Sequence, residues 1–266
     1  MALVIKNSRG QSYRGVAKID DSIFPILFNS PDSKEVFHYS NEDFRNLRVG
    51  LYNVSTECYE YSLRNEHSIF MGGDHLTSFG TVLASLRRFK NEFRLIWIDA
   101  HTDIHSFETS PSWNLHGMVV RLLMTHSYEY IPRLKPEQIL YVGSRSVEKE
   151  EMDFIKQNQI EMISMNDWQN SLNNCLKRIQ DFIIGGNVHI SLDVDAIDPT
   201  ELNSTGTPVE NGLSSHDILD IIESNITIYY PQFKNSLKDK GFNLAMDYFD
   251  KRDGWKAHLF DKYLKV

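Results

Sequence analysis

The sequence predicts a three-layer α/β/α fold with a central, mostly parallel sheet, and three observations predict it. Short apolar runs recur along the chain, and several lack polar alternation, as strands buried on both faces do. Segments with apolar residues at helical spacing lie between these runs, and such alternation indicates right-handed βαβ units with parallel strands. No linker, internal repeat or low-complexity tract divides the 266 residues, so we expect one domain over residues 1–266.

The expected strands are the apolar runs themselves. In chain order they are Ile69–Met71, Leu95–Ile98, Ile139–Val142, Met162–Ile163, Val188–Leu192 and Phe242–Met246. The expected helices show apolar residues three and four positions apart over residues 79–89, 115–123 and 168–183. Towards the two ends we expect an early strand over Phe24–Phe28, a helix within Tyr52–Leu63, a loop or frayed helix over residues 225–240 and a terminal helix over Lys256–Lys265.

Composition narrows the class of protein. The chain has 28 Lys and Arg against 36 Asp and Glu, a formal net charge of −8, which disfavours nucleic acid as a partner and is compatible with a cationic ligand. No apolar run approaches the roughly 20 residues that span a bilayer, and the first residues lack the apolar region of a signal peptide. Cys58 and Cys175 are too few for a disulfide scaffold. We therefore expect a cytoplasmic protein without membrane or nucleic-acid partners.

Polar clusters follow three of the expected strands. They are Gly72–His75, Asp99–Asp103 and Asp193–Asp198. Ligands of open parallel sheets bind at the carboxyl ends of the strands, so these clusters can converge in space. Each cluster alone is also compatible with a polar loop or turn that begins the next helix.

The spacing within the clusters points to metal ligation. Asp99, His101 and Asp103 are two residues apart, so an extended segment projects them from one side, and Asp193 and Asp195 repeat that geometry. Burying so many carboxylates without cations would be very costly. The candidate ligands in these clusters are four carboxylates and two imidazoles, with no thiolate: His75, Asp99, His101, Asp103, Asp193 and Asp195.

This donor set suits two cations that share carboxylates. Oxygen-rich ligation with few imidazoles favours Mn²⁺ over a structural zinc, while Zn, Co, Ni and Fe remain open. Two adjacent metals lower the pKa of a shared water and so generate a nucleophile at neutral pH. The residues alone therefore predict hydrolysis at a dinuclear site.

Four stretches resemble the ureohydrolase family, which includes arginases and agmatinases. They are GGDHLTSFG (72–80), DAHTDIHSFETSPSWNLHG (99–117), YVGSRSVEKEE (141–151) and SLDVDAIDPTELNSTGTPVENGLS (191–214), with a weaker match around Leu244–Asp250. The likeness runs from about residue 67 to 250, in the family's order. It implies an arginase-like three-layer fold with two Mn²⁺ per chain at the strand ends.

The resemblance also implies a role for each ligand. His75 binds one metal and His101 the other. Asp99 and Asp193 bridge the two. Asp103 completes the site of His75 and also hydrogen-bonds the nucleophile. Asp195 completes the site of His101. Two further residues follow from the same resemblance: His116, which shuttles a proton near the leaving amine, and Thr207, which lines the site.

The chain departs from the family where the substrate is recognised. Asp250 stands where arginases usually have the Glu that grips the guanidinium group, and it is one methylene shorter. His105 stands where arginases usually have an Asn that helps to hold the substrate α-carboxylate, and Glu148 where an Asp contacts the α-amino group. Ser112 and Asn114 of the same region are retained. The catalytic set is therefore kept while recognition of a free amino acid is altered.

We therefore predict a hydrolase that releases urea from a guanidino group and converts an arginine side chain to ornithine, with arginine inside a peptide as the leading substrate. Free arginine, agmatine, another small guanidino compound and formiminoglutamate remain alternatives. A catalytically silent binding protein is opposed by the presence of all six ligands. Family members are often oligomeric, so a homo-oligomer remains open.

Overall fold

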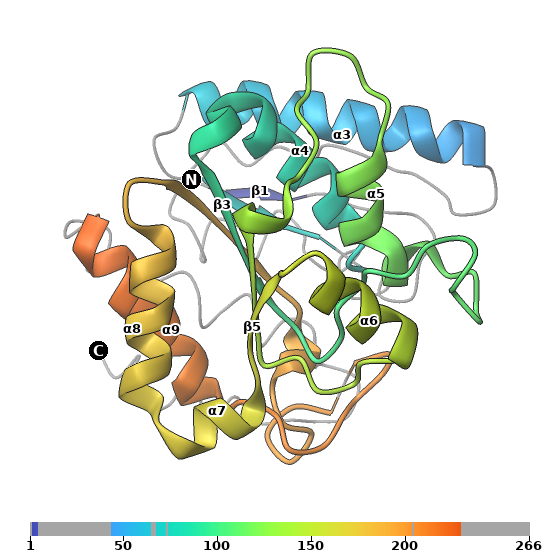
Figure 1. Ribbon diagram of the computed structural model, residues 1–266. Helices are drawn as coiled ribbons and strands as arrows, with labels where there is room; N and C mark the ends of the chain where they lie inside the picture. The colour runs from blue at the N-terminus through green and yellow to red at the C-terminus, as the bar shows by residue number, and fades with distance from the viewer. Residues whose placement is uncertain (1, 5–43, 65–67, 73, 204, 230–266) are drawn as a thin grey trace, which may run out of the picture.

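The computed structural model describes residues 2–4, 44–64, 68–72, 74–203 and 205–229 (Figure 1). The elements, in chain order, are β1 (Ala2–Val4), α3 (Phe44–Arg64), β2 (Ile69–Met71), α4 (Thr77–Phe89), η1 (Lys90–Glu92), β3 (Phe93–Ile98), η2 (Leu115–Met118), α5 (Val119–Thr125), η3 (Pro136–Gln138), β4 (Ile139–Val142), α6 (Lys149–Gln157), β5 (Glu161–Ile163), α7 (Met165–Asn170), α8 (Leu172–Ile183), β6 (Asn187–Leu192), η4 (Val194–Ala196) and α9 (Ser215–Tyr229).

The described strands form parallel sheets, as the alternation of strand and helix predicts. One sheet has the strand order β5-β4-β3-β6, and a separate parallel pair joins β1 to β2. In the larger sheet Ile96 of β3 is in register with Leu140 of β4 on one side and Ile190 of β6 on the other. Parallel neighbours need long crossovers, and the helices supply them.

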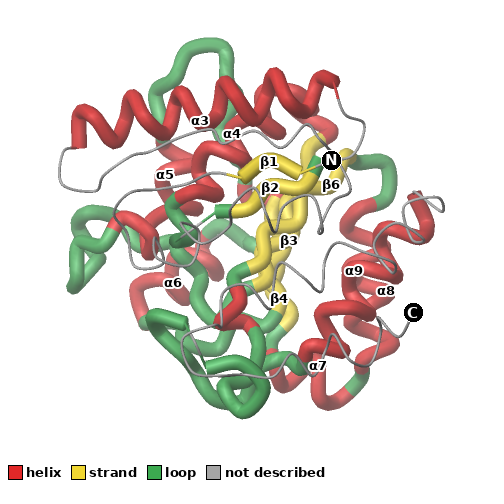
Figure 2. Tube along the Cα trace, turned by 180° about the vertical axis from the view of Figure 1, so that it is seen from behind, coloured by secondary structure: helices red, strands yellow, loops and turns green. Residues whose placement is uncertain are grey.

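Alternate side chains of the central strands bury themselves in two separate cores. Phe93, Leu95 and Trp97 of β3 pack with α3, α4 and α5, whereas Ile96 and Ile98 pack with α7, α8 and α9. All five are fully buried. The period-2 alternation of a strand thus places helices on both faces of the sheet, and Figures 1 and 2 show the two helical layers. The predicted three-layer fold is confirmed.

The contact between α3 and α4 depends on a small residue. α4 turns its apolar face inward, with Phe79, Val82 and Leu86 buried. Gly80 lies on the side towards α3, where a Cβ atom would stand only 2.6 Å from Cγ1 of Val54. A glycine therefore allows the two helices to approach closely.

Three expected elements differ from the structure, and three more lie outside the described residues. The single helix expected over residues 168–183 is wrong, because the chain breaks at Ser171, whose φ of −161° and ψ of 86° are not helical. Its apolar spacing continues across the break because α7 and α8 pack into the same core. Residues 115–118 begin as a 3-10 helix, and α9 continues to Tyr229, into the segment expected as loop or frayed helix. The expectations at Phe24–Phe28, Phe242–Met246 and Lys256–Lys265 lie outside the described residues.

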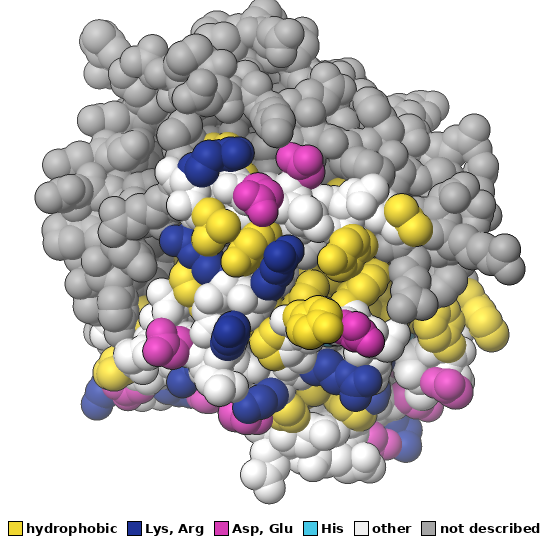
Figure 3. All heavy atoms as spheres, turned by 90° about the horizontal axis from the view of Figure 1, so that it is seen from above, with side chains coloured by type: hydrophobic (Ala, Val, Ile, Leu, Met, Phe, Trp, Pro, Cys, Tyr) yellow, Lys and Arg dark blue, Asp and Glu magenta, His cyan; other side chains and the backbone are white. Residues whose placement is uncertain are grey.

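The face above α3 lies away from the carboxyl ends of the strands. Figure 3 shows basic, acidic and apolar side chains interspersed on the described part of this face. Among the described helices, none is both long and apolar enough to cross a membrane.

Candidate metal centre

The ends of two neighbouring strands deliver the central carboxylates. Asp99 follows β3 directly, and its backbone N–H donates to the carbonyl of Val142 at 3.3 Å. Asp193 follows β6, and its N–H donates to the carbonyl of Ile98 at 2.9 Å. The hydrogen-bond ladder of the sheet thus extends to both residues. The predicted convergence at the carboxyl ends of the strands occurs in the structure.

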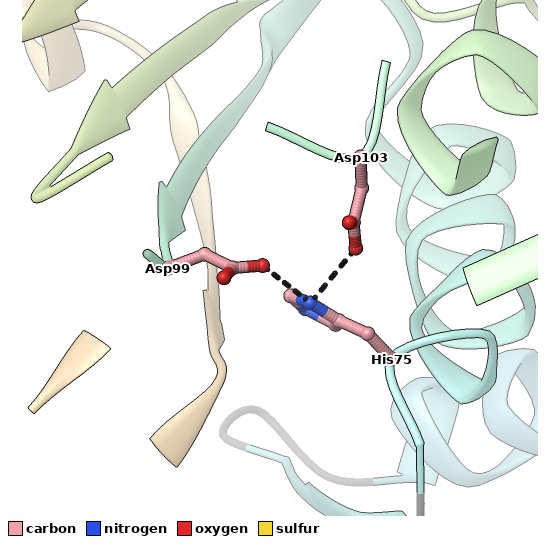
Figure 4. Close-up of side chains that lie close together, drawn as sticks. All are labelled: His75, Asp99 and Asp103. Carbon is pink, nitrogen blue, oxygen red and sulfur yellow. Dashed lines mark hydrogen bonds and ion pairs between the residues drawn. The ribbon is translucent and has the colours of Figure 1, made fainter. Parts of the chain in front are cut away.

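One half of the centre surrounds His75, which lies just before α4. Its Nδ1 atom is 2.8 Å from Oδ2 of Asp99 and 3.2 Å from Oδ2 of Asp103, and Figure 4 shows both carboxylates pointing at the ring. Oδ2 of Asp193 lies 3.4 Å from the same nitrogen. Four of the predicted ligands therefore meet at one imidazole nitrogen.

The other half surrounds His101. Its Nδ1 atom lies 3.4 Å from Oδ1 of Asp99 and 3.2 Å from Oδ2 of Asp195. The hydroxyl of Thr207 donates to that same Asp195 oxygen at 3.2 Å. Asp99 therefore turns one carboxylate oxygen to each histidine and joins the two halves. Two groups of side chains within reach of a metal ion share this residue: His75, Asp99 and Asp103, and Asp99, His101 and Asp195.

Both histidines of the centre have raised pKa values. Burial lowers the pKa of His75, but hydrogen bonds to Asp103 and Asp99 outweigh it and hold the pKa well above 6.5. Burial also opposes protonation of His101, yet hydrogen bonds to Asp195 and Asp99 raise its pKa to about 11. The carboxylates thus create a strongly negative environment around both imidazoles, which favours positive charge at this point.

Most of the carboxylates of the centre have raised pKa values. Burial raises the pKa of Asp103 to about 8, and the charge of Asp99 adds to the rise. Burial and a neighbouring carboxylate raise the pKa of Asp193 and Asp195 as well. Asp99 differs, because hydrogen bonds from both histidines outweigh its burial and lower its pKa. Buried anions this crowded fit the chemistry of a divalent-cation site, with oxygen donors in the majority.

Several supporting residues were missed from the sequence. The hydroxyl of Ser191 donates to Ser78 at 3.0 Å, so its oxygen accepts the 2.8 Å hydrogen bond from Nε2 of His75. Trp97 stacks on the His75 ring, with centroids 4.0 Å apart, and donates its indole N–H to Asp99 at 3.1 Å. Both fix the orientation of ligands. Ser191 and Trp97 each lie two residues before a strand-end aspartate, on the same side of the strand, and that spacing is the signal that could have found them.

Arg145 holds the segment after β6 in place. Its guanidinium donates to five backbone carbonyls, those of Gly143, Asp195, Ala196, Val209 and Glu210. The loop that carries Thr207 and the strand-end aspartates is thereby tied to the loop after β4. Arg145 lies in one of the four stretches that resemble the family, but the sequence alone indicates no role for it.

His116 lies in η2 at the edge of the centre and is half-buried. Burial lowers its pKa, and the charges of Asp193, His75, His101 and Asp99 all act on it. The backbone N–H of His105 donates to the carbonyl of Gly117 at 3.3 Å, and that of Val120 donates to Asp103 at 2.8 Å. These bonds keep the segment that contains His116 beside the metal centre.

His105 faces two glutamates at the start of α6. Its buried Nε2 has no hydrogen-bond partner and lies 3.5 Å from Oε2 of Glu148 and 3.7 Å from Oε2 of Glu151. Glu151 is itself buried and accepts from the hydroxyl of Thr102 at 2.7 Å and from the N–H of Glu148 at 3.0 Å. The pairing of His105 with Glu148 brings together the two positions at which the chain departs from its family.

The remaining candidate residues line an open edge. Ser112, Asn114 and Thr207 are exposed, and Ser112 accepts from the N–H of Asn114 at 3.3 Å. The side chain of Glu148 is 55% exposed. Asp250, the expected guanidinium contact, lies outside the described residues.

Comparison with known proteins establishes the family. The model of the arginase family matches residues 24–228. This chain belongs to the arginase family. The resemblance to ureohydrolases is thereby confirmed, and the arginase family is one of dinuclear metal enzymes, for which the centre around Asp99 offers candidate ligands.

Individual arginases match a large part of the chain. An arginase of Bacillus subtilis (strain 168) is 29% identical over 187 residues, covering 66% of this chain and 63% of that protein. An arginase of Staphylococcus aureus (strain COL) is 36% identical over 174 residues, covering 60% of this chain and 57% of that arginase. The chain thus spans less than two thirds of these two relatives. The crystal structure of arginase from Bacillus subtilis shares the fold, with a TM-score of 0.71 at 22% identity over 87% of this chain and 86% of that one.

Proposed function

We propose that this chain hydrolyses the guanidino group of an arginine side chain, releasing urea and leaving ornithine, and that the arginine lies within a peptide. The observation that carries the proposal is the placement of Asp99, which turns one oxygen to each of two imidazole–carboxylate groups. A shared carboxylate between two ligand groups suits a pair of cations. Membership of the arginase family supports the reaction class.

We further propose that the centre holds two Mn²⁺ ions. Both ions would share Asp99 and Asp193. One ion would also be held by His75 and Asp103, and the other by His101 and Asp195. The oxygen-rich donor set and the raised pKa values of the buried carboxylates support this assignment. When bound, two adjacent divalent cations lower the pKa of a water molecule and stabilise developing negative charge.

The residues around the centre then position the substrate and move protons. Water adds to the guanidino carbon, the bond from that carbon to the side-chain nitrogen breaks, and the leaving amine takes a proton. His116 suits that transfer, because burial lowers its pKa and keeps it neutral at neutral pH, so it can accept and return a proton. Asp250 would supply the carboxylate that contacts the guanidinium group.

The edge of the site favours an arginine without free amino-acid ends. In the structure Nε2 of His105 lies 3.5 Å from the carboxylate of Glu148, so the group expected to meet a substrate ammonium already faces an imidazole ring. Ser112 and Asn114 are exposed rather than enclosed. An open edge leaves room for the chain that continues on both sides of an arginine in a peptide.

A urea-release assay in Mn²⁺ tests the proposal, with arginine, agmatine, capped arginine amide, guanidino acids and Arg-containing peptides as substrates. Mass spectrometry should show that the peptides lose the mass of one cyanamide unit. Efficient turnover of free arginine with no peptide product would reject the peptide substrate but keep the reaction. Formamide in place of urea would identify a formimino hydrolase. No turnover of any substrate by protein that contains two equivalents of metal would reject the reaction itself. Asp193→Ala is the negative control.

A further inference from the structure

A loop with two exposed aromatic residues projects beside the metal centre. We call residues 106–114 the rim loop. Its neck is closed by the hydrogen bond from His105 to Gly117, so the loop leaves the fold just after Asp103 and returns just before His116. Figures 1 and 2 both show this segment between β3 and η2 standing out from the body. The loop is therefore continuous with the candidate site.

Hydrogen bonds give the rim loop a defined shape. The N–H of Ser110 donates to the carbonyl of Ser106 at 2.9 Å, and the N–H of Ser106 donates to the hydroxyl of Thr109 at 2.9 Å. The N–H of Trp113 donates to the hydroxyl of Ser110 at 3.0 Å, and Thr109 also bonds Nδ1 of His105 at 3.0 Å. The side chains on the loop are thus presented by an ordered backbone that is tied to the His105 ring.

Two aromatic side chains lie together on this backbone. Trp113 is 67% exposed and Phe107 is 37% exposed, and their ring centroids are 6.3 Å apart with planes tilted by 55°. Trp113 has a φ of 59°, a left-handed conformation in which a non-glycine residue is strained. Glycine there would relieve the strain and remove the exposed apolar surface, so folding does not account for tryptophan at this position.

The position of the pair sets which part of a substrate it can reach. Phe107 is four residues after Asp103 and Trp113 three residues before His116, so extended chain places their backbones within about 14 Å of these site residues. One or two residues of an extended peptide span about 7 Å. Because the arginine side chain adds its own length to this span, the pair can meet residues that flank an arginine while the guanidino group occupies the metal centre. Residues 106–114 contain no Lys or Arg, so the loop offers no cation to the carboxylate of a free amino acid.

We propose that Phe107 and Trp113 form an aromatic clasp that binds an apolar or aromatic residue next to the arginine of a peptide substrate. The clasp rests on the proposed function, because it names the substrate feature that the same site recognises. Stacked aromatic contacts supply affinity and are tolerant of the exact partner. The exposed carboxylate of Glu148 nearby favours peptides without an acidic residue beside the arginine.

The test compares three variants with the unaltered holoenzyme. Phe107→Ala and Trp113→Gly remove the clasp, and the glycine also relieves backbone strain, so the Tm of that variant should be retained. Tyr130→Ala is the matched control, because Tyr130 is 93% exposed with a φ of 67° but lies on the loop between α5 and η3. The substrates are a peptide with phenylalanine beside the arginine, the same peptide with glycine there, and capped arginine amide.

Two readouts separate the clasp from the reaction. The first is the ratio of kcat/KM for the phenylalanine peptide to that for capped arginine amide, which should fall about tenfold in both clasp variants and not in Tyr130→Ala. The second is binding of the ornithine-containing product peptide, followed by tryptophan fluorescence in the unaltered protein and by calorimetry in all variants. It needs no turnover.

The outcomes are distinct. Weaker product-peptide binding in both clasp variants supports the clasp even if no guanidino substrate is hydrolysed, in which case the proposed function alone fails. Hydrolysis of both peptides with equal ratios in every variant overturns the clasp and leaves the proposed function standing. A loss of self-association in Trp113→Gly, with peptide binding unchanged, overturns the clasp in favour of a contact between copies of the chain.

Discussion

We expect acid to destabilise this protein through a histidine that lies outside the metal centre. His189 of β6 is half-buried and packs beside Phe70 and Phe93, and its Nδ1 atom bonds the hydroxyl of Ser85 at 2.8 Å. Burial lowers its pKa from 6.5 to about 4. The folded protein therefore keeps the ring neutral at pH values where the unfolded chain protonates it.

The sign and size of the effect follow from proton linkage. Between pH 6.5 and about pH 4 the unfolded state binds the extra proton, so the contribution of His189 to stability is complete above pH 6.5 and is lost as the pH falls towards 4. Each pKa unit corresponds to about 1.4 kcal/mol, so the total loss is about 3 kcal/mol. That is a large part of the 5–15 kcal/mol, roughly, by which domains are stable.

The assay compares His189→Gln with the unaltered chain. Urea unfolding curves at pH 7, 6, 5 and 4, in the presence of a chelator, give the free energy of unfolding of each protein. The stability difference between them should shrink by about 3 kcal/mol from pH 7 to pH 4, because glutamine does not titrate and the metal centre is common to both. Parallel loss of stability in the two proteins over this range would refute the assignment.

Three further predictions concern the centre and its supports. Ser191→Ala should lower metal affinity by roughly 10–100-fold, because Nε2 of His75 loses its hydrogen-bond partner. Calorimetric titration with Mn²⁺ measures this affinity, and an unchanged value would contradict the prediction. Gly80→Ala should lower the free energy of unfolding by about 1–3 kcal/mol, because it forces a Cβ atom against Val54. In the control Gly117→Ala the new Cβ meets no atom within 4 Å, so equal urea midpoints for the two variants would contradict the prediction. Mn²⁺ at about a hundred times its Kd should stabilise the folded chain by about 2.7 kcal/mol. A Tm that changes with neither Mn²⁺ nor EDTA would argue against a metal centre.

The convergence of the candidate ligands could be predicted from the sequence because they form short-range patterns. Asp99, His101 and Asp103 are spaced by two directly after a buried strand. The topology of a parallel sheet then brings them to the same edge as the residues that follow neighbouring strands. Ser191 and Trp97 escaped notice because a serine and a tryptophan inside apolar strands resemble ordinary core residues. Their contacts with His75 join residues far apart in the chain, and spacing alone does not report such contacts.

Other features depended on tertiary contacts from the start. The break at Ser171 was hidden because both α7 and α8 bury their apolar faces in one core, so the apolar spacing never lapses. β1 is three residues long and becomes a strand only through pairing with β2. His105 and Glu148 were each recognised as departures from the family, but their contact across 43 positions of sequence required the structure.

The way Asp99 and Asp193 enter the centre has a consequence for its dynamics. Their backbone amides form the last hydrogen bonds of the β4–β3–β6 ladder, at 3.3 Å and 2.9 Å, so the backbone at neither residue can move away unless sheet hydrogen bonds break first. Amide hydrogen exchange at these two residues should be as slow as in the strand interior, and slower than at His101 or Asp103 in the loop beyond. We therefore expect the backbone of these two candidate ligands to belong to the most slowly opening part of the fold, and metal exchange to begin at the residues of the loop.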